Sequence, residues 1–293
     1  MATRDILGAS GILGINRRNR EYILKVNPRG FYPSVDDKLI TKEILEKNKI
    51  PAPKLFFSIR DNYEFRRLKQ IKSLDDFVIK PSNGAMGRGI LVITGQKDGK
   101  WVKANGDKLG YEDISYQVSN ILAGLYSLGG RTDSAFAEYR VKIHNIFSSV
   151  AYEGVPDIRV IVYRKIPVMS MLRLPTKESD GKANLHQGSV GVGVDMDKGV
   201  TYGGVQYDRS VERHPDTGVT LEGIRLPFWK DIMEMSVRIA GIFKMGYIGI
   251  DFVIDEGLGP MVLELNARPG LSIQIANRCG ILGRLEEIDR RGL

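Results

Sequence analysis

The clearest hydrophobic pattern in the chain is a pair of apolar stretches separated by a short turn. Residues 247–254 read YIGIDFVI and residues 261–266 read MVLELN, with DEGLG at 255–259 between them. Apolar runs joined by a short turn containing Gly are typical of an antiparallel hairpin. Side chains alternate along a strand, so Glu264 and Asn266 share one face, and Asp251 on the other strand can converge with them. The pattern predicts three oxygen-bearing side chains in one place.

Three hard oxygen ligands on adjacent strands suit Mg²⁺, which also keeps water or phosphate oxygens in its coordination shell. Such a site predicts a bound nucleotide. The alternative is that Asp251 and Glu264 are solvated residues at strand ends, or form a structural ion pair with Arg268, because buried carboxylates are usually paired. Spacing alone does not choose between the two interpretations.

The remaining hydrophobic pattern predicts both helices and strands. Helical spacing occurs after an Asp cap at residue 36, near 62–72, over 114–128 and over 228–243, and strand-like runs occur at 22–26, 50–57, 77–81, 90–94 and 135–143. Two further strands are expected in DIRVIVYRKIPVMSMLRLP, with their turn at Arg164 and Lys165. Residues 180–227 are polar and glycine-rich, which favours short strands and hairpins over an active-site face.

Composition narrows the class of protein. The chain has 293 residues, of which 42% are hydrophobic and 27% charged, as in an ordinary globular protein with a substantial core. No apolar run reaches membrane-spanning length, and residues 6–15 lack the features of a signal peptide, so a cytoplasmic protein is expected. The single cysteine, Cys279, excludes an intrachain disulfide. The net charge of +8 is spread along the chain, which favours steering of anionic substrates over nucleic-acid binding.

A glycine loop lies between two predicted strands in FVIKPSNGAMGRGILVIT, residues 77–94. Such a hairpin can present backbone amides to anionic oxygens, with one lysine at the root of the loop and one arginine within it. The residues concerned are Lys80, Gly84, Gly87, Arg88 and Gly89. The alternative is an ordinary flexible hairpin turn. The earlier Gly8, Gly11 and Gly14 do not have the spacing of a dinucleotide-binding loop.

Several motifs occur in order along almost the whole chain: DK at 37–38, VIKP at 78–81, the glycine loop, AEYRV at 137–141, DIR at 157–159, NLHQG at 184–188, GIDFV at 249–253 and LELNARPG at 263–270. Together they resemble the ATP-grasp superfamily. DIR, NLHQG and ELNARPGL are similar to the alpha-L-glutamate ligase branch, which includes RimK-type enzymes. HPDTGV and LPFW resemble sugar-transfer-associated ATP-grasp proteins.

The resemblance implies an α+β fold with two lobes gripping ATP. It divides the chain into an abbreviated N-terminal segment (1–35), a lobe carrying the glycine loop (36–136) and a lobe carrying the metal site (137–293). It assigns the phosphates to Lys38, Lys80 and the loop, the adenine pocket to Glu138, Tyr139 and Val141, and the metal to Asp251, Glu264 and Asn266. Arg159, Asn184 and His186 would face the γ-phosphate and the acyl group, and Arg268 the substrate.

The activity implied is that of an ADP-forming carboxylate–amine ligase that uses ATP and two Mg²⁺ ions, for which Mn²⁺ can substitute. A carboxylate attacks the γ-phosphorus, and an amine then displaces phosphate from the acyl phosphate to form an amide. The amine acceptor could be an amino acid, a peptide or a protein, with glutamate as one added group, although Gln187, Gly188 and Ser189 depart from the glutamate ligase pattern. A homo-oligomer is compatible with the sequence.

No protein nucleophile is required, which agrees with three His, one Cys and no GxSxG motif. Two alternatives belong to other classes. A regulatory or scaffold protein could have kept the nucleotide site without the chemistry, and a basic nucleic-acid binder would show salt-sensitive affinity.

Overall fold

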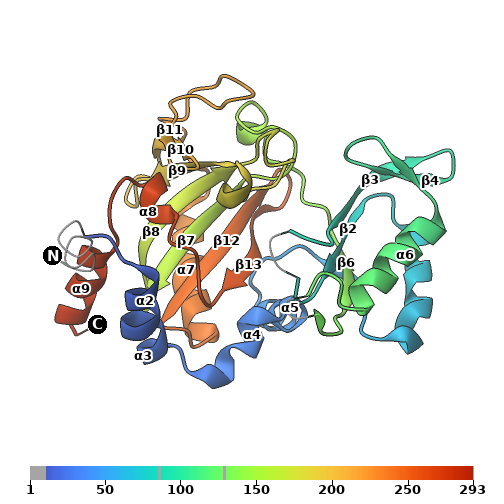
Figure 1. The fold of residues 1–293 in the computed structure, drawn as a ribbon, viewed down its shortest axis with the longest axis horizontal. Coiled ribbons are helices and arrows are strands. Elements are labelled where there is room, and N and C mark those ends of the chain that lie inside the picture. The colour runs from blue at the N-terminus through green and yellow to red at the C-terminus, as the bar shows by residue number, and fades with distance from the viewer. Residues whose placement is uncertain (1–10, 85–86, 128–129, 293) are drawn as a thin grey trace. The chain divides into compact units, whose positions relative to one another are not determined.

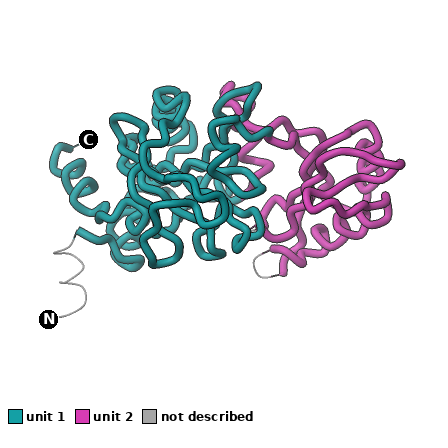
Figure 2. The backbone as a smooth tube through the Cα atoms, turned by 90° about the horizontal axis from the view of Figure 1, so that it is seen from above, with its two compact units in different colours: residues 1–36, 142–293 teal, residues 37–141 magenta. Residues whose placement is uncertain are grey.

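A computed structural model describes residues 11–84, 87–127 and 130–292. The mildly apolar stretch at 6–15, which was not expected to be a signal peptide, therefore lies largely outside the described residues, as do Gly8 and residues 85–86 of the glycine loop. The chain divides by its internal contacts into two compact units (Figure 2). Unit 1 consists of residues 1–36 and 142–293, and unit 2 of residues 37–141. The functional division proposed from the sequence stays a prediction.

Unit 2 is built on a six-stranded antiparallel sheet in the order β1-β6-β2-β3-β4-β5 (Figure 1). Its strands are β1 (Leu55–Ile59), β2 (Phe77–Pro81), β3 (Leu91–Lys97), β4 (Lys100–Lys103), β5 (Lys108–Leu109) and β6 (Ala135–Glu138), and its helices are α5 (Lys38–Lys47), η3 (Asn62–Ser73) and α6 (Tyr111–Leu122). One apolar cluster joins the sheet to η3 and α6, with Leu68, Phe77 and Ile114 fully buried. Burial of that cluster supplies the main driving force for this unit.

Unit 1 carries a seven-stranded antiparallel sheet in the order β11-β10-β9-β8-β7-β12-β13. Its strands are β7 (Asp157–Tyr163), β8 (Ile166–Leu174), β9 (Val190–Val194), β10 (Thr201–Gln206), β11 (Arg209–Ser210), β12 (Tyr247–Asp255) and β13 (Gly259–Asn266). Helix α7 (Trp229–Ile242) contacts β7, β8 and β12, whereas α8 (Ile273–Ala276) contacts β8, β9 and β10. Figure 1 shows β12 and β13 side by side at one edge of this sheet.

The remaining elements of unit 1 are short. They are α2 (Ile15–Arg17), η1 (Arg18–Ile23), α3 (Leu24–Val26), η2 (Arg29–Phe31), α4 (Pro33–Asp36), η5 (Asn145–Phe147), η6 (Leu185–Gln187) and α9 (Leu282–Arg290). The early helices are tied to the late part of the chain, because the Asn27 side chain both accepts from the backbone N–H of Tyr247 and donates to its carbonyl. No helix among the described residues has the length and apolar character needed to cross a membrane.

Most of the predicted elements are present, with three corrections. The strand expected at 22–26 is wrong: the segment is helical, because Arg18, Tyr22 and Val26 recur at four-residue spacing and the first two are buried. The helix expected to reach residue 128 ends at Leu122, where Gly124 follows with a positive φ of 81°. The strand expected over 135–143 ends at Glu138, so Glu138 closes the strand.

The β7–β8 turn has no glycine, yet it is a tight two-residue hairpin. Arg164 and Lys165 both have positive φ, 48° and 65°, which is the backbone that a type I′ turn requires. Tyr163 then pairs with Ile166, and the register places Asp157 opposite Arg173. This register determines which charged side chains meet on the sheet.

Helix α8 lies close to β9, and the glycines of VGVGV make that approach possible. A Cβ atom at Gly193 would lie 2.9 Å from the carbonyl oxygen of Ala276, and one at Gly191 would lie 3.3 Å from the Ala276 Cβ. The glycines of β9 therefore leave room for the segment after β13 to lie against the sheet.

The polar segment before α7 is anchored by a buried histidine. The His214 ring is 1% exposed; Nε2 lies 2.9 Å from the Pro175 carbonyl oxygen, and Nδ1 accepts from the backbone N–H groups of Asp216 and Thr217. Burial lowers the pKa of His214, although the Pro175 carbonyl and Asp216 oppose the shift. The folded state therefore holds this ring neutral.

We expect His214 to make stability depend on pH. Because its folded pKa lies below the unfolded value of about 6.5, its contribution is present above pH ~6.5 and is lost as the pH falls below that value. Urea unfolding of the wild type and His214→Asn between pH 8 and 5.5 measures this, and the variant should lose stability less steeply on acidification. Equal pH profiles would show that His214 titrates alike in both states.

Candidate active site

The hairpin β12–β13 brings the three predicted metal ligands together on one face. In its register Asp251 is opposite Glu264 and Gly249 is opposite Asn266, with one irregularity between Asp251 and Phe252. Opposite residues in an antiparallel pair point to the same side, and so do residues two apart. The Asn266 Nδ2 lies 3.3 Å from Asp251 Oδ2. The predicted convergence of these side chains is thus present.

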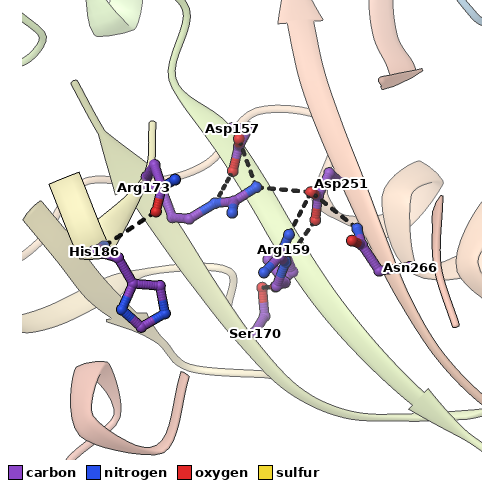
Figure 3. Close-up of polar contacts among 8 residues, drawn as sticks. Asp157, Arg159, Ser170, Arg173, His186, Asp251 and Asn266 are labelled. Carbon is purple, nitrogen blue, oxygen red and sulfur yellow. Dashed lines mark hydrogen bonds and ion pairs between the residues drawn. The ribbon is translucent and has the colours of Figure 1, made fainter. Parts of the chain in front are cut away.

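Asp251 is buried in a network of ion pairs (Figure 3). Arg159 donates from Nε to Asp251 Oδ1 at 2.7 Å and from Nη2 to Oδ2 at 2.6 Å, and Arg173 Nη2 donates to Oδ2 at 2.8 Å. Arg173 also forms a two-point pair with Asp157, at 2.5 and 2.7 Å. Two arginines therefore balance two carboxylates, and Asp251 pairs with Arg159 and Arg173 instead of with Arg268.

The network follows from strand register. Asp157 and Arg159 are two residues apart on β7 and share a face, Arg173 lies opposite Asp157 on β8, and Asp251 lies opposite Arg159 on β12. Arg173 and Asp157 were not singled out from the sequence. The DIR motif contained Asp157, but Arg173 becomes recognisable only once the β7–β8 register is known.

The network controls the charge of Asp251. Burial acts to raise the pKa of Asp251, but the charges of Arg159 and Arg173 outweigh it and hold that pKa well below its usual range. Burial likewise acts to lower the pKa of Arg173, and the two carboxylates outweigh it and raise that pKa. The two arginines therefore favour the ionised form of Asp251, which is the form that binds a metal ion.

The side chains on this face carry the type of donor atom that Mg²⁺ prefers. The set consists of two carboxylates, Asp251 and Glu264, and one amide oxygen, that of Asn266, all hard oxygen donors. Asp251 Oδ1 accepts one of the hydrogen bonds described above and Oδ2 accepts three, so Oδ1 retains a lone pair for a cation. Among the described residues, no group of three His, Cys, Asp or Glu side chains could hold a metal.

The other predicted catalytic residues lie apart from the ion pairs. Asn184 caps the short helix η6, where its side-chain oxygen accepts from the His186 backbone N–H at 3.1 Å, and the exposed His186 ring has no bond to the network in Figure 3. Arg268 stacks on the Tyr32 ring, with its Cζ 4.4 Å from the ring centroid, and approaches Asp36 at 3.9 Å. Their predicted roles stay predictions.

Unit 2 has its own buried charge cluster, in which Glu138 lies between two lysines. Lys42 Nζ is 2.6 Å from Glu138 Oε2, and Lys80 Nζ is 2.5 Å from Glu138 Oε1. Lys42 was missed from the sequence because it looks like a surface lysine of an amphipathic helix. Burial acts to raise the pKa of Glu138, and the two lysines outweigh it and lower that pKa. The cluster carries a net positive charge.

The described part of the glycine loop is held by polar contacts at its root. Lys38 Nζ donates to the Gly84 carbonyl at 2.8 Å, and a Cβ atom at Gly89 would collide with the Tyr126 ring at 2.5 Å. Gly87 and the exposed Arg88 lie between them, and Gly87 has a positive φ of 71°. The buried Asp133 accepts from the backbone and side chain of Asn83 and from Ser127 Oγ. After Lys42, Asp133 is the second residue of unit 2 that the sequence did not reveal.

The segment predicted to read adenine continues directly from β6. The Tyr139 backbone N–H donates to the Lys54 carbonyl at 2.8 Å, and the Val141 side chain is buried. Glu138 pairs on both sides, with Leu55 of β1 and Val78 of β2. The backbone here is therefore rigidly supported, and its role toward a nucleotide stays a prediction.

Comparison with solved structures shows the fold. The crystal structure of D-cycloserine synthetase DcsG is similar at a TM-score of 0.52 and 12% identity, covering 91% of this chain and 73% of that one. The ATP-grasp ligase PsnB complexed with minimal precursor has a TM-score of 0.49 at 14% identity, and the D-alanine–D-alanine ligase of Bacillus anthracis has the same TM-score and identity. The PsnB comparison covers 91% of this chain and 64% of PsnB, and the D-alanine–D-alanine ligase comparison covers 89% and 67%.

Sequence comparison covers nearly the whole chain. No curated protein matches it significantly. The family described as sugar-transfer associated ATP-grasp matches residues 17–290, from the last residue of α2 to the last residue of α9. The expected α+β ATP-grasp fold is confirmed by the family match, by the similarity to D-cycloserine synthetase DcsG and by the two antiparallel sheets. The chain therefore belongs to the sugar-transfer associated ATP-grasp family.

Proposed function

We propose that this protein is an ATP- and Mg²⁺-dependent carboxylate–amine ligase that forms ADP, phosphate and an amide. The observation that carries the proposal is the single sheet face of unit 1 on which Asp251, Glu264 and Asn266 adjoin two arginines. Membership of the sugar-transfer associated ATP-grasp family supports ATP as the bound nucleotide. A binding protein without chemistry would have little need of three oxygen donors beside guanidinium groups.

The reaction has two steps. A substrate carboxylate oxygen bonds to the γ-phosphorus of ATP while the bond from that phosphorus to the ADP oxygen breaks, which leaves an acyl phosphate. An amine nitrogen then bonds to the acyl carbon, phosphate departs and the amine loses a proton. Two anions must meet in the first step, so stabilisation of negative charge lowers the barrier most. Mg²⁺ bound by Asp251, Glu264 and Asn266 would offset phosphate charge.

The protein contributes positive charge and rigid support. Arg159 favours the ionised form of Asp251, and its guanidinium would also contact phosphate oxygens. In unit 2, Lys38, Lys80 and the described part of the 84–89 loop supply cations and backbone donors for phosphates. We propose that backbone groups of the Glu138–Val141 segment form hydrogen bonds with the polar edge of adenine. His186 and Asn184 would contact the acyl group.

The first experiment is a measurement of ADP release from ATP and Mg²⁺ with pools of carboxylic acids and amines, followed by mass spectrometry of the products. The proposal expects ADP release that requires both an acid and an amine, and a product joined by an amide. Amino acids such as glutamate and short peptides belong in the pools. ATP binding without ADP release in any pool would contradict the proposal.

One observation favours a second candidate, a nucleotide-binding regulatory protein without ligase activity. The Asp251 carboxylate is already neutralised by Arg159 and Arg173. Such a protein would bind ATP equally well with and without Mg²⁺. The ligase requires that the metal strengthen nucleotide binding, so a titration of ATP with and without Mg²⁺ distinguishes the two.

We expect Lys80→Ala to weaken ATP binding. The substitution removes a phosphate contact worth roughly 2 kcal/mol, while Lys42 still pairs with Glu138 and preserves the fold. Calorimetric titration with ATP and Mg²⁺ should show a dissociation constant raised by about 30-fold. Lys97→Ala, at an exposed position in β3, is the control and should bind as the wild type does. Unchanged affinity in Lys80→Ala would remove Lys80 from the phosphate site.

A further inference from the structure

A surface cavity of about 440 Å³ opens beside Arg268 in unit 1. Its lining comes from the N-terminal helices and from a residue two positions after β13: Asn19, Ile23, Leu24, Arg29, Tyr32 and Arg268. The volume is that of a small-molecule site. Ile23, Leu24 and Tyr32 give it an apolar wall, and Ile23 and Tyr32 are buried.

The polar groups of this cavity are hydrogen-bond donors. Arg268 lies over the Tyr32 ring, and the side chain of Arg29 has no hydrogen-bond or ion-pair partner among residues 11–84, 87–127 and 130–292. Asn19 uses its side-chain oxygen to accept from Arg18 Nε at 3.1 Å and Nη2 at 2.8 Å. Its amide N–H groups are what remains for a ligand.

A third guanidinium, that of Arg18, contacts the lining residue Asn19 and has no carboxylate partner in the described part of the chain. Arg18 is 7% exposed, and besides Asn19 its contact is with the Pro269 carbonyl, at 2.5 Å. Nearby, the buried Tyr247 hydroxyl has no hydrogen-bond partner in the described structure. Among the residues that the structure describes, the acid that approaches Arg268 is the half-exposed Asp36, at 3.9 Å. The region thus has an excess of positive charge, partly buried, that an anion would neutralise.

We propose that this cavity binds a non-reacting oxyanion of the substrate, with the substrate's apolar part against Ile23, Leu24 and Tyr32. The inference rests on the proposed ligase function, and it specifies the substrate as a molecule with a second anionic group. A carboxylate held by arginine forks has its lone pairs occupied and its charge neutralised, so it is a poor nucleophile. The reacting carboxylate therefore lies elsewhere, and the cavity holds the other end.

The position of the cavity suits this role. Arg268 follows Asn266 by two residues, so their Cα atoms are at most ~7 Å apart. An anion at Arg268 would thus place the rest of a small substrate beside the predicted metal ligands. A carboxylate and a phosphate share this recognition chemistry, and the experiment separates them.

The test is a titration of the full-length protein, without ATP or metal, with hexanoate, hexyl phosphate and the neutral hexanamide. Hexanoate or hexyl phosphate should bind at least about tenfold more tightly than hexanamide. The tighter of the two identifies the anion as carboxylate or phosphate. Equal binding of all three, or binding of none, would overturn the proposal.

Variants assign the binding to the cavity. Arg29→Gln should weaken binding of the preferred anion by about tenfold. Leu24→Asp, at an exposed rim position, should weaken it by a similar factor, because it adds a negative charge. Arg290→Gln, an exposed arginine of α9, is the matched control and should bind as the wild type does. Anion binding that both cavity variants retain would contradict the assignment. Since no ATP is present, this outcome is independent of whether the protein releases ADP.

Discussion

Glu264→Gln is expected to reduce ADP formation by more than about a hundredfold. The substitution keeps the shape of the side chain but removes the charge of one proposed metal ligand, and a lost ligand at a phosphoryl-transfer site costs several kcal/mol of transition-state stabilisation. The initial rate of ADP release is measured at saturating ATP and Mg²⁺, with the substrates found in the pooled assay.

Glu222→Gln, at an exposed position in the same unit, is the matched control and should retain wild-type turnover. Both variants should unfold at the wild-type temperature, because Glu264 is only partly buried. Near-normal turnover in Glu264→Gln would show that the metal site has been assigned to the wrong residues. A matched loss in Glu222→Gln would point to a general effect of charge.

Arg173→Met should destabilise the protein by about 3 to 5 kcal/mol. Removing one partner of a buried ion pair leaves the opposite charge without compensation, and here both Asp157 and Asp251 lose their contacts with Arg173. Urea unfolding followed by circular dichroism measures the change. The effect should appear in the free energy of unfolding of unit 1.

Two further variants test the physical cause. Arg284→Met removes an exposed pair with Glu287 at 3.2 Å and should cost at most about 1 kcal/mol. Adding Asp157→Asn to Arg173→Met should recover part of the lost stability, because the uncompensated charge is then removed. A loss below about 1 kcal/mol in Arg173→Met would mean that water solvates these carboxylates.

Local sequence patterns predicted the part of the site that depends on neighbouring residues. Asp251, Glu264 and Asn266 lie on one hairpin with a short turn, so alternation along the two strands was enough to bring them together. The helix at 36–49 was recognisable for the same reason, since Asp37 caps it from the adjacent position. Pattern and local geometry agree in these segments.

The residues that were missed depend on pairing between distant segments. Lys42 becomes buried because β6, almost a hundred residues later, places Glu138 beside it, and no local pattern of α5 records this. Arg173 depends on a two-residue turn made of Arg164 and Lys165, which do not have the glycine that usually marks such turns. The segment at 22–26 has the apolar residues of a strand, and its surroundings depend on a distant part of the chain: the Gly246 N–H donates to the Val26 carbonyl at 3.2 Å.

The division of unit 1 into two separate lengths of chain has a consequence for biosynthesis. Unit 2 is continuous, so all of its strands have been made by the time residue 141 leaves the ribosome. The early helices cannot make their tertiary contacts until the C-terminal part of unit 1 has been synthesised. Leu13 is hydrogen-bonded to Gln274 across 261 residues, and Asn27 to Tyr247 across 220. Contacts of such long sequence separation form slowly. A stalled or shortened chain would therefore present a folded unit 2 preceded by an apolar N-terminal segment without its sheet, which is a ready target for chaperones.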